Sequence, residues 1–339
     1  MGKDQESLNQ SRAIRSHLLT QWGKIPTSIW KADWSVKVTD LSKSYLDFQK
    51  EQVKKYGKFY EDNPALQLSS AGHGKEGGLS RFPQDLCQFL VKFLCPEKIG
   101  QAGYFGNYLA TVIDPFSGHN SRAESTWLCN RNYVGWDCCI KHDRLNKEIL
   151  AKLESASMLI KPDAKMEFIL GDSRDINYNE QFDFSITSPP FYDIEYYGNE
   201  SEQLGRAKTY NDFIYTLSTI FDNIYRALRP NTYCVVETND FRRNGEFHTY
   251  HADMISILKR VGFTIHDMII CDYGTGFLEA FLSDIEANKI VSKEHSYFVV
   301  AKKLYKRIET RQETRERLLV EIQNNNGQVQ PTVQQAKMI

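Results

Sequence analysis

Residues 183–191 read Asp-Phe-Ser-Ile-Thr-Ser-Pro-Pro-Phe, an apolar run that ends in two consecutive prolines. Phe182 to Thr187 have the composition of a buried strand, and Pro189 and Pro190 supply a rigid turn at its end. Because neither proline has an N–H, the turn offers the carbonyl of Pro189 and the hydroxyl of Ser188 as hydrogen-bond acceptors. With the ring of Phe191 beside them, these acceptors suit the exocyclic amino group of a flat heterocycle. Taken alone, the motif is equally compatible with an ordinary turn after a strand.

Three more apolar runs precede this strand, and each is followed by an acidic residue. The runs are Ala110–Ile113, Tyr133–Trp136 and Met166–Leu170, and the acids that follow are Asp114, Asp137 and Asp172. Helical patterns separate the runs, so the sequence predicts a parallel, doubly wound sheet covered on both faces. Ligands of such sheets bind at the carboxyl ends of the strands, where we expect the three acids and Ser188 to share one crevice. A cofactor with an amine, a ribose diol and an adenine amino group would supply partners for the buried carboxylates.

The alternation of helices and strands continues on both sides of these runs. The remaining predicted elements are a helix from Ser80 to Leu94, helices at about 122 and 142–153, helix 209–228, strand 233–237, helix 251–261 and strands 264–271 and 295–301. The last two strands are joined by a loop, and Pro83 lies in the first turn of the first helix.

The proline turn and the ordered strand ends resemble those of the S-adenosylmethionine-dependent DNA amino-methyltransferases, which modify N4 of cytosine or N6 of adenine. The resemblance spans about Ser80 to Lys303. It implies an α/β, Rossmann-like class I methyltransferase fold: a mostly parallel, seven-stranded sheet with a C-terminal antiparallel hairpin. It also implies S-adenosylmethionine as the cofactor and double-stranded DNA as the partner, with the target base flipped out of the helix.

The resemblance also assigns roles to individual residues. The catalytic residues would be Ser188, Pro189, Pro190 and Phe191. The cofactor-binding residues would be Arg81, Phe82, Pro83, Asp114, Pro115, Phe116, Gly118, Arg122, Asp137, Asp172 and Ser173. Asp193, Tyr196 and Tyr197 would line the pocket for the target base. Asp137 would take the ribose hydroxyls, and Asp172 would lie by the adenine.

One segment departs from the family pattern. Family members usually follow the first glycine with Ser-Gly-Thr, whereas Gly118 is followed here by His119, Asn120, Ser121 and Arg122. The missing second glycine puts the usual approach of the backbone to the methionine moiety in doubt. Arg122 is compatible with an ion pair to the methionine carboxylate, with recognition of a modified cofactor, and with a solvated salt bridge.

The turn also favours one reaction over others. An exocyclic amine is a weak nucleophile because its lone pair is conjugated with the ring, and acceptors at Ser188 and the Pro189 carbonyl favour a pyramidal nitrogen. Serine before the two prolines favours N4 of cytosine over N6 of adenine, since a hydroxyl can accept from the amine and donate to the ring nitrogen. Methylation at carbon-5 of cytosine needs a Pro-Cys nucleophile, which this sequence lacks.

Composition sets further expectations for the 339 residues. Lys and Arg number 42 and Asp and Glu 43, so nucleic-acid contacts must rest on local patches rather than on a global basic field. Seven cysteines without a C-x-x-C pair favour a reducing compartment and predict neither a disulfide framework nor a metal site. No apolar run approaches the ~20 residues of a membrane span. We expect a soluble cytoplasmic protein of prokaryotic or viral origin; its oligomeric state is not indicated.

The sequence suggests three parts: an N-terminal arm (1–78), a catalytic domain (79–305) and a charged helix with a polar tail (306–339). The arm contains Trp22, Trp30 and Trp34 beside basic residues, which is compatible with DNA contact or with covering the core. Because no separate target-recognition block stands out, we assign sequence recognition to residues 1–70 and to the loop 272–293.

Three alternatives share the predicted fold. The protein could methylate an amine in RNA, it could be a DNA-binding protein that has lost turnover, or it could transfer a larger group from a modified cofactor.

Overall fold

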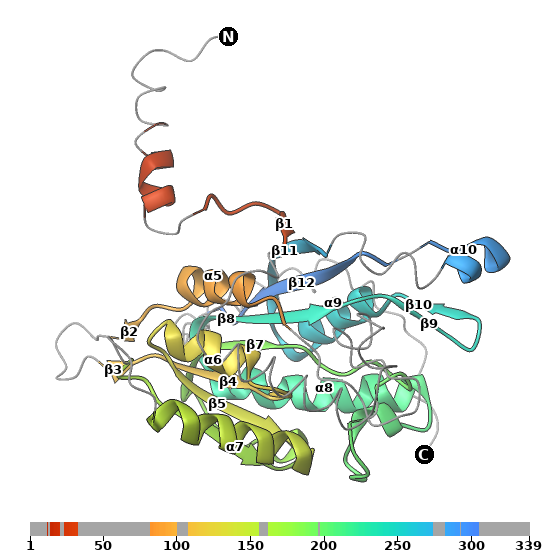
Figure 1. The fold of residues 1–339 in the computed structure, drawn as a ribbon, viewed down its shortest axis with the longest axis horizontal. Helices are drawn as coiled ribbons and strands as arrows, with labels where there is room; N and C mark the ends of the chain where they lie inside the picture. The colour runs from red at the N-terminus through yellow and green to blue at the C-terminus, as the bar shows by residue number, and fades with distance from the viewer. Residues whose placement is uncertain are drawn as a thin grey trace, which may run out of the picture. The chain divides into compact units, whose positions relative to one another are not determined.

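Eight strands form one central sheet (Figure 1). It is described from a computed structural model, and the description covers residues 12, 14–20, 24–32, 82–99, 108–155, 162–195, 197–273, 282–291 and 293–304. The strands are β1 (Ile29–Lys31), β4 (Thr111–Asp114), β5 (Asn132–Asp137), β6 (Met166–Leu170), β7 (Phe182–Thr187), β8 (Leu228–Thr238), β11 (Thr264–Asp272) and β12 (His295–Lys302). Across the sheet their order is β1-β11-β12-β8-β7-β4-β5-β6.

The strand directions are those expected from the sequence. From β8 through β7, β4 and β5 to β6, neighbouring strands run parallel. The strand β12 is antiparallel to both β8 and β11. The predicted α/β class I methyltransferase architecture, a mostly parallel sheet closed by a C-terminal antiparallel hairpin, is therefore confirmed.

The expectation of seven strands is wrong by one. The additional strand, β1, pairs in parallel with β11 at the edge of the sheet. Trp30 on this strand is 5% exposed, and its Nε1 donates to Asp85 Oδ2 at 2.8 Å. Its ring centroid lies 4.8 Å from that of Phe89. Burial of this indole explains why the strand joins the sheet; Trp30 covers the core, whereas Trp22 and Trp34 lie outside the described residues.

Helices cover both faces of the sheet (Figure 1). They are α5 (Gln84–Leu94), α6 (Ser121–Leu128), α7 (Ile140–Ser155), α8 (Tyr210–Ala227), α9 (Tyr250–Val261) and α10 (Leu282–Asn288). Val236 packs in one core cluster with α8 and α9, and Val235 packs in another with α5 and α6. Adjacent strand residues point to opposite faces, so these clusters lie on the two sides of β8.

Two short antiparallel hairpins and α10 were not predicted. The hairpins are β2 (Lys98–Ile99) with β3 (Tyr108–Leu109), and β9 (Phe241–Arg243) with β10 (Glu246–His248). The turn between β9 and β10 contains Asn244 at φ +51° and Gly245 at φ +82°, residue types that tolerate this left-handed backbone. The segment 272–293, expected as a loop, contains α10.

Polar side chains come together at the carboxyl ends of the parallel strands, which form one edge of the sheet. The five parallel strands end there. The strand β11 also ends there, because β8 and β11 are both antiparallel to β12 and therefore run in the same direction. The antiparallel strand β12 begins at this edge, so its first residues meet the last residues of β8 and β11. Seven strands therefore bring their polar ends together at this edge.

The remaining expectations concern the ends of the chain. In the predicted N-terminal arm, residues 14–20 are helical, and the domain boundary expected near 78 lies outside the described residues. The compact unit that contains the sheet ends at Leu304, and the predicted tail 306–339 lies outside the described residues. Within the described part of the chain, no helix has the length and apolar character to cross a membrane. All seven cysteines are free thiols.

Candidate functional site

A cavity of about 490 Å³ opens at the carboxyl edge of the sheet. The adjacent strands β4, β5 and β6 and the loops after them contribute Gly118, Asp137 and Asp172 to one side of it. On the other side of the strand order, β7 and β8 contribute Ser188 of the proline turn and Glu237. The acids and the proline turn that the sequence predicted to meet therefore share one cavity.

The proline turn is fixed from behind. Ser188, Pro190 and Phe191 line the cavity. The first amide after the two prolines, that of Phe191, donates to Glu195 Oε2 at 3.1 Å, and Tyr197 Oη donates to the same oxygen at 2.8 Å. The ring of Phe191 makes edge contacts with two aromatic side chains, Phe241 at 5.8 Å and Tyr250 at 5.9 Å between centroids. The turn is thus held rigidly, with one hydroxyl and one aromatic ring facing the cavity.

Glu237 is the next-to-last residue of β8, and it lines the cavity together with Ser188. Its Oε1 accepts from the hydroxyls of Tyr273 and Ser296, the latter at 3.0 Å, and these two hydroxyls also bond to each other. Ser188 also lies close enough to lower the pKa of this carboxyl. Burial raises the pKa of Glu237, while its hydroxyl donors and the charge of Arg122 oppose that rise. The result is a carboxylate whose bonded neighbours are neutral hydroxyls.

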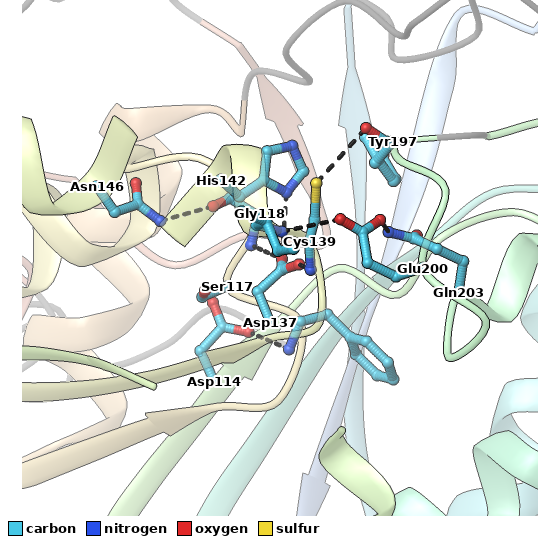
Figure 2. A network of polar contacts seen from close by, with 12 residues as sticks. Asp114, Ser117, Gly118, Asp137, Cys139, His142, Asn146, Tyr197, Glu200 and Gln203 are labelled. Carbon is cyan, nitrogen blue, oxygen red and sulfur yellow. Dashed lines mark hydrogen bonds and ion pairs between the residues drawn. The ribbon is translucent and has the colours of Figure 1, made fainter. Parts of the chain in front are cut away.

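Asp137 is the centre of a second network (Figure 2). It accepts from the amides of Gly118 at 2.8 Å and Cys139 at 2.7 Å, and its Oδ2 lies 3.3 Å from Nδ1 of His142. Burial opposes ionisation of Asp137, but His142 and the two amides outweigh it and lower the pKa of this carboxyl. Asn146 Nδ2 donates to the carbonyl of Gly118 at 2.8 Å, which ties α7 to the loop after β4.

Asp172 lies at the third strand end and pairs with a close neighbour in the chain. Its Oδ1 accepts from the amide of Arg174 at 2.8 Å, and its Oδ2 accepts from Arg174 Nε at 2.7 Å and from Nη2. This hydrogen bond from the guanidinium raises the pKa of Arg174. Asp172, Ser173 and Arg174 all line the cavity.

Asp114 lies beneath the cavity rather than on its wall. It is fully buried, and it accepts from Arg122 Nε at 2.6 Å, Tyr133 Oη at 2.8 Å, Thr187 Oγ1 at 2.6 Å and the amide of Phe116 at 3.0 Å. A carboxylate has about four lone-pair sites, so these bonds satisfy it. A direct contact between Asp114 and a ligand would require one of them to break.

Arg122, in the segment that departs from the family pattern, is a buried residue of the cavity wall. Besides Asp114, its guanidinium donates to the carbonyls of Phe116 and Ser117, and it lies 5.1 Å from the ring of Phe82. Burial opposes its charge, but Asp114 more than compensates and raises the pKa of Arg122. Among the described residues, Nη1 of Arg122 has no hydrogen-bond partner. Arg122 thus presents a fixed positive charge to the cavity, unlike the solvated helix-face arginine considered from the sequence.

Comparisons with known proteins reveal only distant structural likeness. No family model and no curated protein matches the chain. Its fold is similar to that of a candidate DNA modification methylase from Thermus thermophilus crystallised with S-adenosyl-L-methionine, at 24% identity and a TM-score of 0.31, over 43% of this chain and 59% of that one.

Two further solved structures are similar at the same distant level. A SAM-dependent methyltransferase from Methanosarcina mazei has 15% identity and a TM-score of 0.41, over 58% of this chain and 93% of that one. TrmN from Thermus thermophilus has 14% identity and a TM-score of 0.40, over 66% of this chain and 49% of that one. The chain spans little more than half of the Thermus methylase.

The predicted site residues divide into those on the cavity wall and those outside it. On the wall lie Ser188, Pro190, Phe191, Pro115, Phe116, Gly118, Arg122, Asp137, Asp172, Ser173 and Tyr197. Asp114, Pro189, Phe82 and Pro83 are buried and are not among the lining residues. Phe82 instead packs its ring 5.3 Å from that of Phe298 in the core. Arg81 and Tyr196 lie outside the described residues.

Asp193 does not line the cavity as predicted. It has a positive φ of 50°, and its Oδ2 accepts from Arg243 Nε at 2.6 Å. This ion pair links the segment after the proline turn to the hairpin β9–β10. Asp193 therefore holds the cavity wall from outside.

Sequence reasoning named Arg242 as a possible phosphate contact but placed none of the residues after Val236 in the cavity. Glu237, Thr238, Asn239, Asp240 and Arg242 all line the cavity. Within the described part of the chain, Oγ1 of buried Thr238 and Oδ1 of Asn239 have no hydrogen-bond partner. Unsatisfied buried polar atoms beside a cavity are typical of a ligand site. The available signal was the run of polar residues at the end of the fifth parallel strand, where ligands of such sheets bind.

Three atoms that can bind metals meet beside Asp137. Its carboxylate, Cys139 Sγ and His142 Nδ1 lie within 4.8 Å of one another. Burial raises the pKa of the Cys139 thiol to about 11, and this thiol donates to the carbonyl of Tyr197 at 3.5 Å. In Figure 2 these three residues belong to the hydrogen-bonded network around Asp137.

Proposed function

We propose that the protein transfers a methyl group from S-adenosylmethionine to an exocyclic amino group of a DNA base, with N4 of cytosine favoured over N6 of adenine. The observation that supports this most directly is the single cavity with two unlike sides. Asp137, Asp172 and Arg122 line one side, and Ser188 and Phe191 line the other. Such a cavity brings a charged cofactor and a flat amine-bearing ring together at one place.

The side chains on the first side fit S-adenosylmethionine. From the described residues, Asp137 Oδ1 and Asp172 Oδ1 each accept one hydrogen bond, so each keeps a lone pair for a hydroxyl or amino group. Arg122 Nη1, which has no partner among those residues, would bind a carboxylate. The volume of about 490 Å³ lies within the ~300–1,000 Å³ typical of small-molecule pockets. When bound, this cofactor supplies a methyl group on a positively charged sulfur.

Ser188 and Glu237 would handle the proton of the amine. Methylation forms a bond from the amine nitrogen to the methyl carbon, breaks the bond from that carbon to sulfur, and releases one proton. Ser188 lies close enough to Glu237 to lower the pKa of that carboxyl, so it would turn its hydroxyl proton toward Glu237 and a lone pair toward the incoming amine. The departing proton can pass to Ser188 while the proton of Ser188 passes to Glu237.

Phe191 would hold the flipped base. Its ring is fixed by Phe241 and Tyr250, so stacking a base on its free face requires no rearrangement of the pocket. The preference for cytosine rests on the neutral side chain of Ser188, since the adenine enzymes of the family favour an acid or an amide there. A base within a duplex must leave the stack to reach this cavity.

The test is methyl transfer followed by identification of the product. The full chain is incubated with methyl-labelled S-adenosylmethionine and unmodified DNA, the DNA is digested, and the nucleosides are analysed by mass spectrometry. We expect N4-methylcytosine, and we expect its loss with Ser188→Ala. N6-methyladenine instead would overturn the base preference, and label in no amine of any DNA tried would overturn the proposal.

Parallel samples separate the alternatives. Label in RNA but not in DNA would identify an RNA methyltransferase. A nucleoside heavier than the methylated base would indicate transfer of a larger group. Calorimetry with S-adenosylmethionine covers the case without turnover: micromolar binding favours an enzyme, and absent binding favours a DNA-binding protein that keeps the fold.

A further inference from the structure

The hairpin β9–β10 presents a partly exposed aromatic ring that lies close to two cations of the cavity wall. Phe247 is 37% exposed, with the guanidinium carbon of Arg242 5.1 Å and Nζ of Lys293 4.5 Å from its ring centroid. Arg242 is the residue directly opposite Phe247 in the hairpin, whereas Lys293 comes from the segment before β12. Arg242 and Lys293 also line the cavity. We call Phe247, Arg242 and Lys293 the mouth cluster.

In the described part of the chain, no acidic side chain compensates the charge of the mouth cluster. Among the described residues, neither Arg242 nor Lys293 lies within ion-pair distance of a carboxylate. The neighbouring Arg243 differs, because it pairs with Asp193 at 2.6 Å. Two positive charges beside one ring, with no described carboxylate near them, attract an anionic partner. With a net charge of −1 the whole chain has no basic field, so this attraction is local.

The opposite face of the hairpin is anchored in the core. Phe241 and His248, the next opposed pair, stack at 4.9 Å between centroids. His248 also lies 4.3 Å from the ring of Tyr210. Phe241 in turn contacts Phe191 of the proline turn at 5.8 Å. A partner held on the outer face is therefore held in a fixed position relative to the catalytic turn.

We infer that the mouth cluster binds the nucleic-acid strand on either side of the extruded base. Arg242 and Lys293 bind backbone phosphates, and a neighbouring base stacks on Phe247. Phosphate contacts combined with aromatic stacking are the usual means of binding an unpaired strand. The inference rests on the proposed function, in that it takes nucleic acid as the substrate. It adds Arg242 and Phe247 to the loop 272–293 that the sequence assigned to recognition and that contains Lys293.

Binding without turnover tests this inference. A fluorescein-labelled single-stranded oligonucleotide of mixed sequence is titrated with the full chain, and anisotropy gives Kd at several salt concentrations. We expect Phe247→Ala to weaken binding roughly 5- to 150-fold, the effect of removing one stacking contact. We expect Arg242→Gln and Lys293→Gln each to weaken binding and to lower the salt dependence, the slope of log K on log salt, by about 0.7.

Matched controls lie on the outer surfaces of α8 and α9. Tyr215→Ala removes an aromatic ring that is 74% exposed, and Lys259→Gln removes an exposed cation. We expect both controls to bind as the wild type does. Thermal unfolding of all five variants checks that each is folded. A Phe247→Ala variant that binds normally, or charge variants that match Lys259→Gln in salt slope, would overturn the inference.

Two further outcomes are distinguishable. An acidic peptide, polyglutamate, serves as a competitor: if its binding depends on Phe247 and that of the oligonucleotide does not, the partner is a protein and the inference is wrong. If methyl transfer is not detected but oligonucleotide binding follows the expected pattern, the mouth cluster stands and the proposed reaction fails. If methyl transfer is detected and the mouth variants leave Kd and KM unchanged, only the inference on the mouth cluster fails.

Discussion

Asp114 and Glu237 lie near the ends of two strands that flank β7, yet their surroundings differ. Asp114 is fully buried, and it accepts hydrogen bonds from the positively charged Arg122 as well as from neutral donors. Glu237 reaches the cavity and is bonded by neutral hydroxyls that can exchange protons. A carboxylate paired with a buried arginine is suited to holding structure, whereas one among hydroxyls is suited to moving a proton. We therefore expect opposite consequences when each acid is changed.

The largest expected effect is on stability. Asp114→Asn leaves Arg122 buried without its counter-charge, and we expect a loss of about 3–5 kcal/mol in the free energy of unfolding. Urea unfolding measured by circular dichroism gives this value. The double variant Asp114→Asn/Arg122→Met is the matched control, because it removes both charges and should recover part of the loss. A loss below about 1 kcal/mol in the single variant would contradict the structural role of the pair.

The next effect is on rate alone. In the proposed reaction, Ser188→Ala removes the acceptor for the amine, and we expect kcat for methyl transfer to fall about 10²- to 10³-fold, as when one preorganised polar group is lost from a site. Unfolding free energy should change little, because Ser188 is a partly exposed residue of the cavity wall. Single-turnover methyl incorporation at saturating DNA measures the rate. A variant with wild-type kcat would remove Ser188 from the chemistry.

The strands and the order of their ends could be predicted from the sequence. Strands such as Met166–Leu170 and Phe182–Thr187 were predicted at their observed bounds, because buried parallel strands are apolar runs bounded by turn residues. The order of the strand ends then placed Asp137, Asp172 and Ser188 around one cavity. Local pattern and a topological rule were sufficient for this much.

Side-chain partners required the fold. Glu237 depends on Tyr273 and Ser296, which are 36 and 59 residues away along the chain. Asp114 was expected on the cavity wall, but its carboxylate is occupied by partners that include Tyr133 and Thr187, 19 and 73 residues away. The hairpin β9–β10 was missed because its strands are three residues each, too short for a periodic pattern. Tertiary packing, rather than local propensity, decides these features.

Glu237→Gln should lower activity without lowering stability, whereas Asp114→Asn should lower stability. We expect kcat to fall about 10²-fold, since an amide cannot take up the proton of Ser188. Because burial raises the pKa of Glu237, ionising it in the folded protein costs stability as pH rises above its ordinary value of 4.5. The variant should therefore be at least as stable as the wild type at pH 7.

The pH profile of kcat adds an independent measurement. The wild-type rate should fall as pH decreases through the raised pKa of Glu237, and the residual rate of Glu237→Gln should lack that limb. Rates between pH 5 and 8 and urea unfolding at pH 7 provide the two readings. A variant that loses stability in proportion to its activity would place Glu237 with Asp114 as a structural residue.

Asp137 is intermediate between the two acids, and the smallest expected effect concerns it. It lines the cavity, as Glu237 does, but its pKa is lowered because His142 and the backbone amides outweigh burial. A carboxyl with a lowered pKa contributes stability above its ordinary value of 3.8, and that contribution is lost as pH falls below it. His142→Phe keeps the ring that packs 5.0 Å from Tyr197 but removes the bond to Asp137. We expect a loss of about 1 kcal/mol at pH 7.

This loss should depend on pH in a way that a packing defect does not. As pH falls from 3.8 through the lowered pKa of Asp137, protonation of this carboxyl progressively removes the interaction, so the unfolding free energies of wild type and variant should converge. Urea titrations at pH 7, 5 and 3 follow the difference, with His266→Phe on the exposed side of β11 as the control. A difference that persists unchanged at pH 3 would mean that His142 acts through packing. Asp137 would then resemble Asp114, a carboxylate held by fixed partners, more than it resembles Glu237.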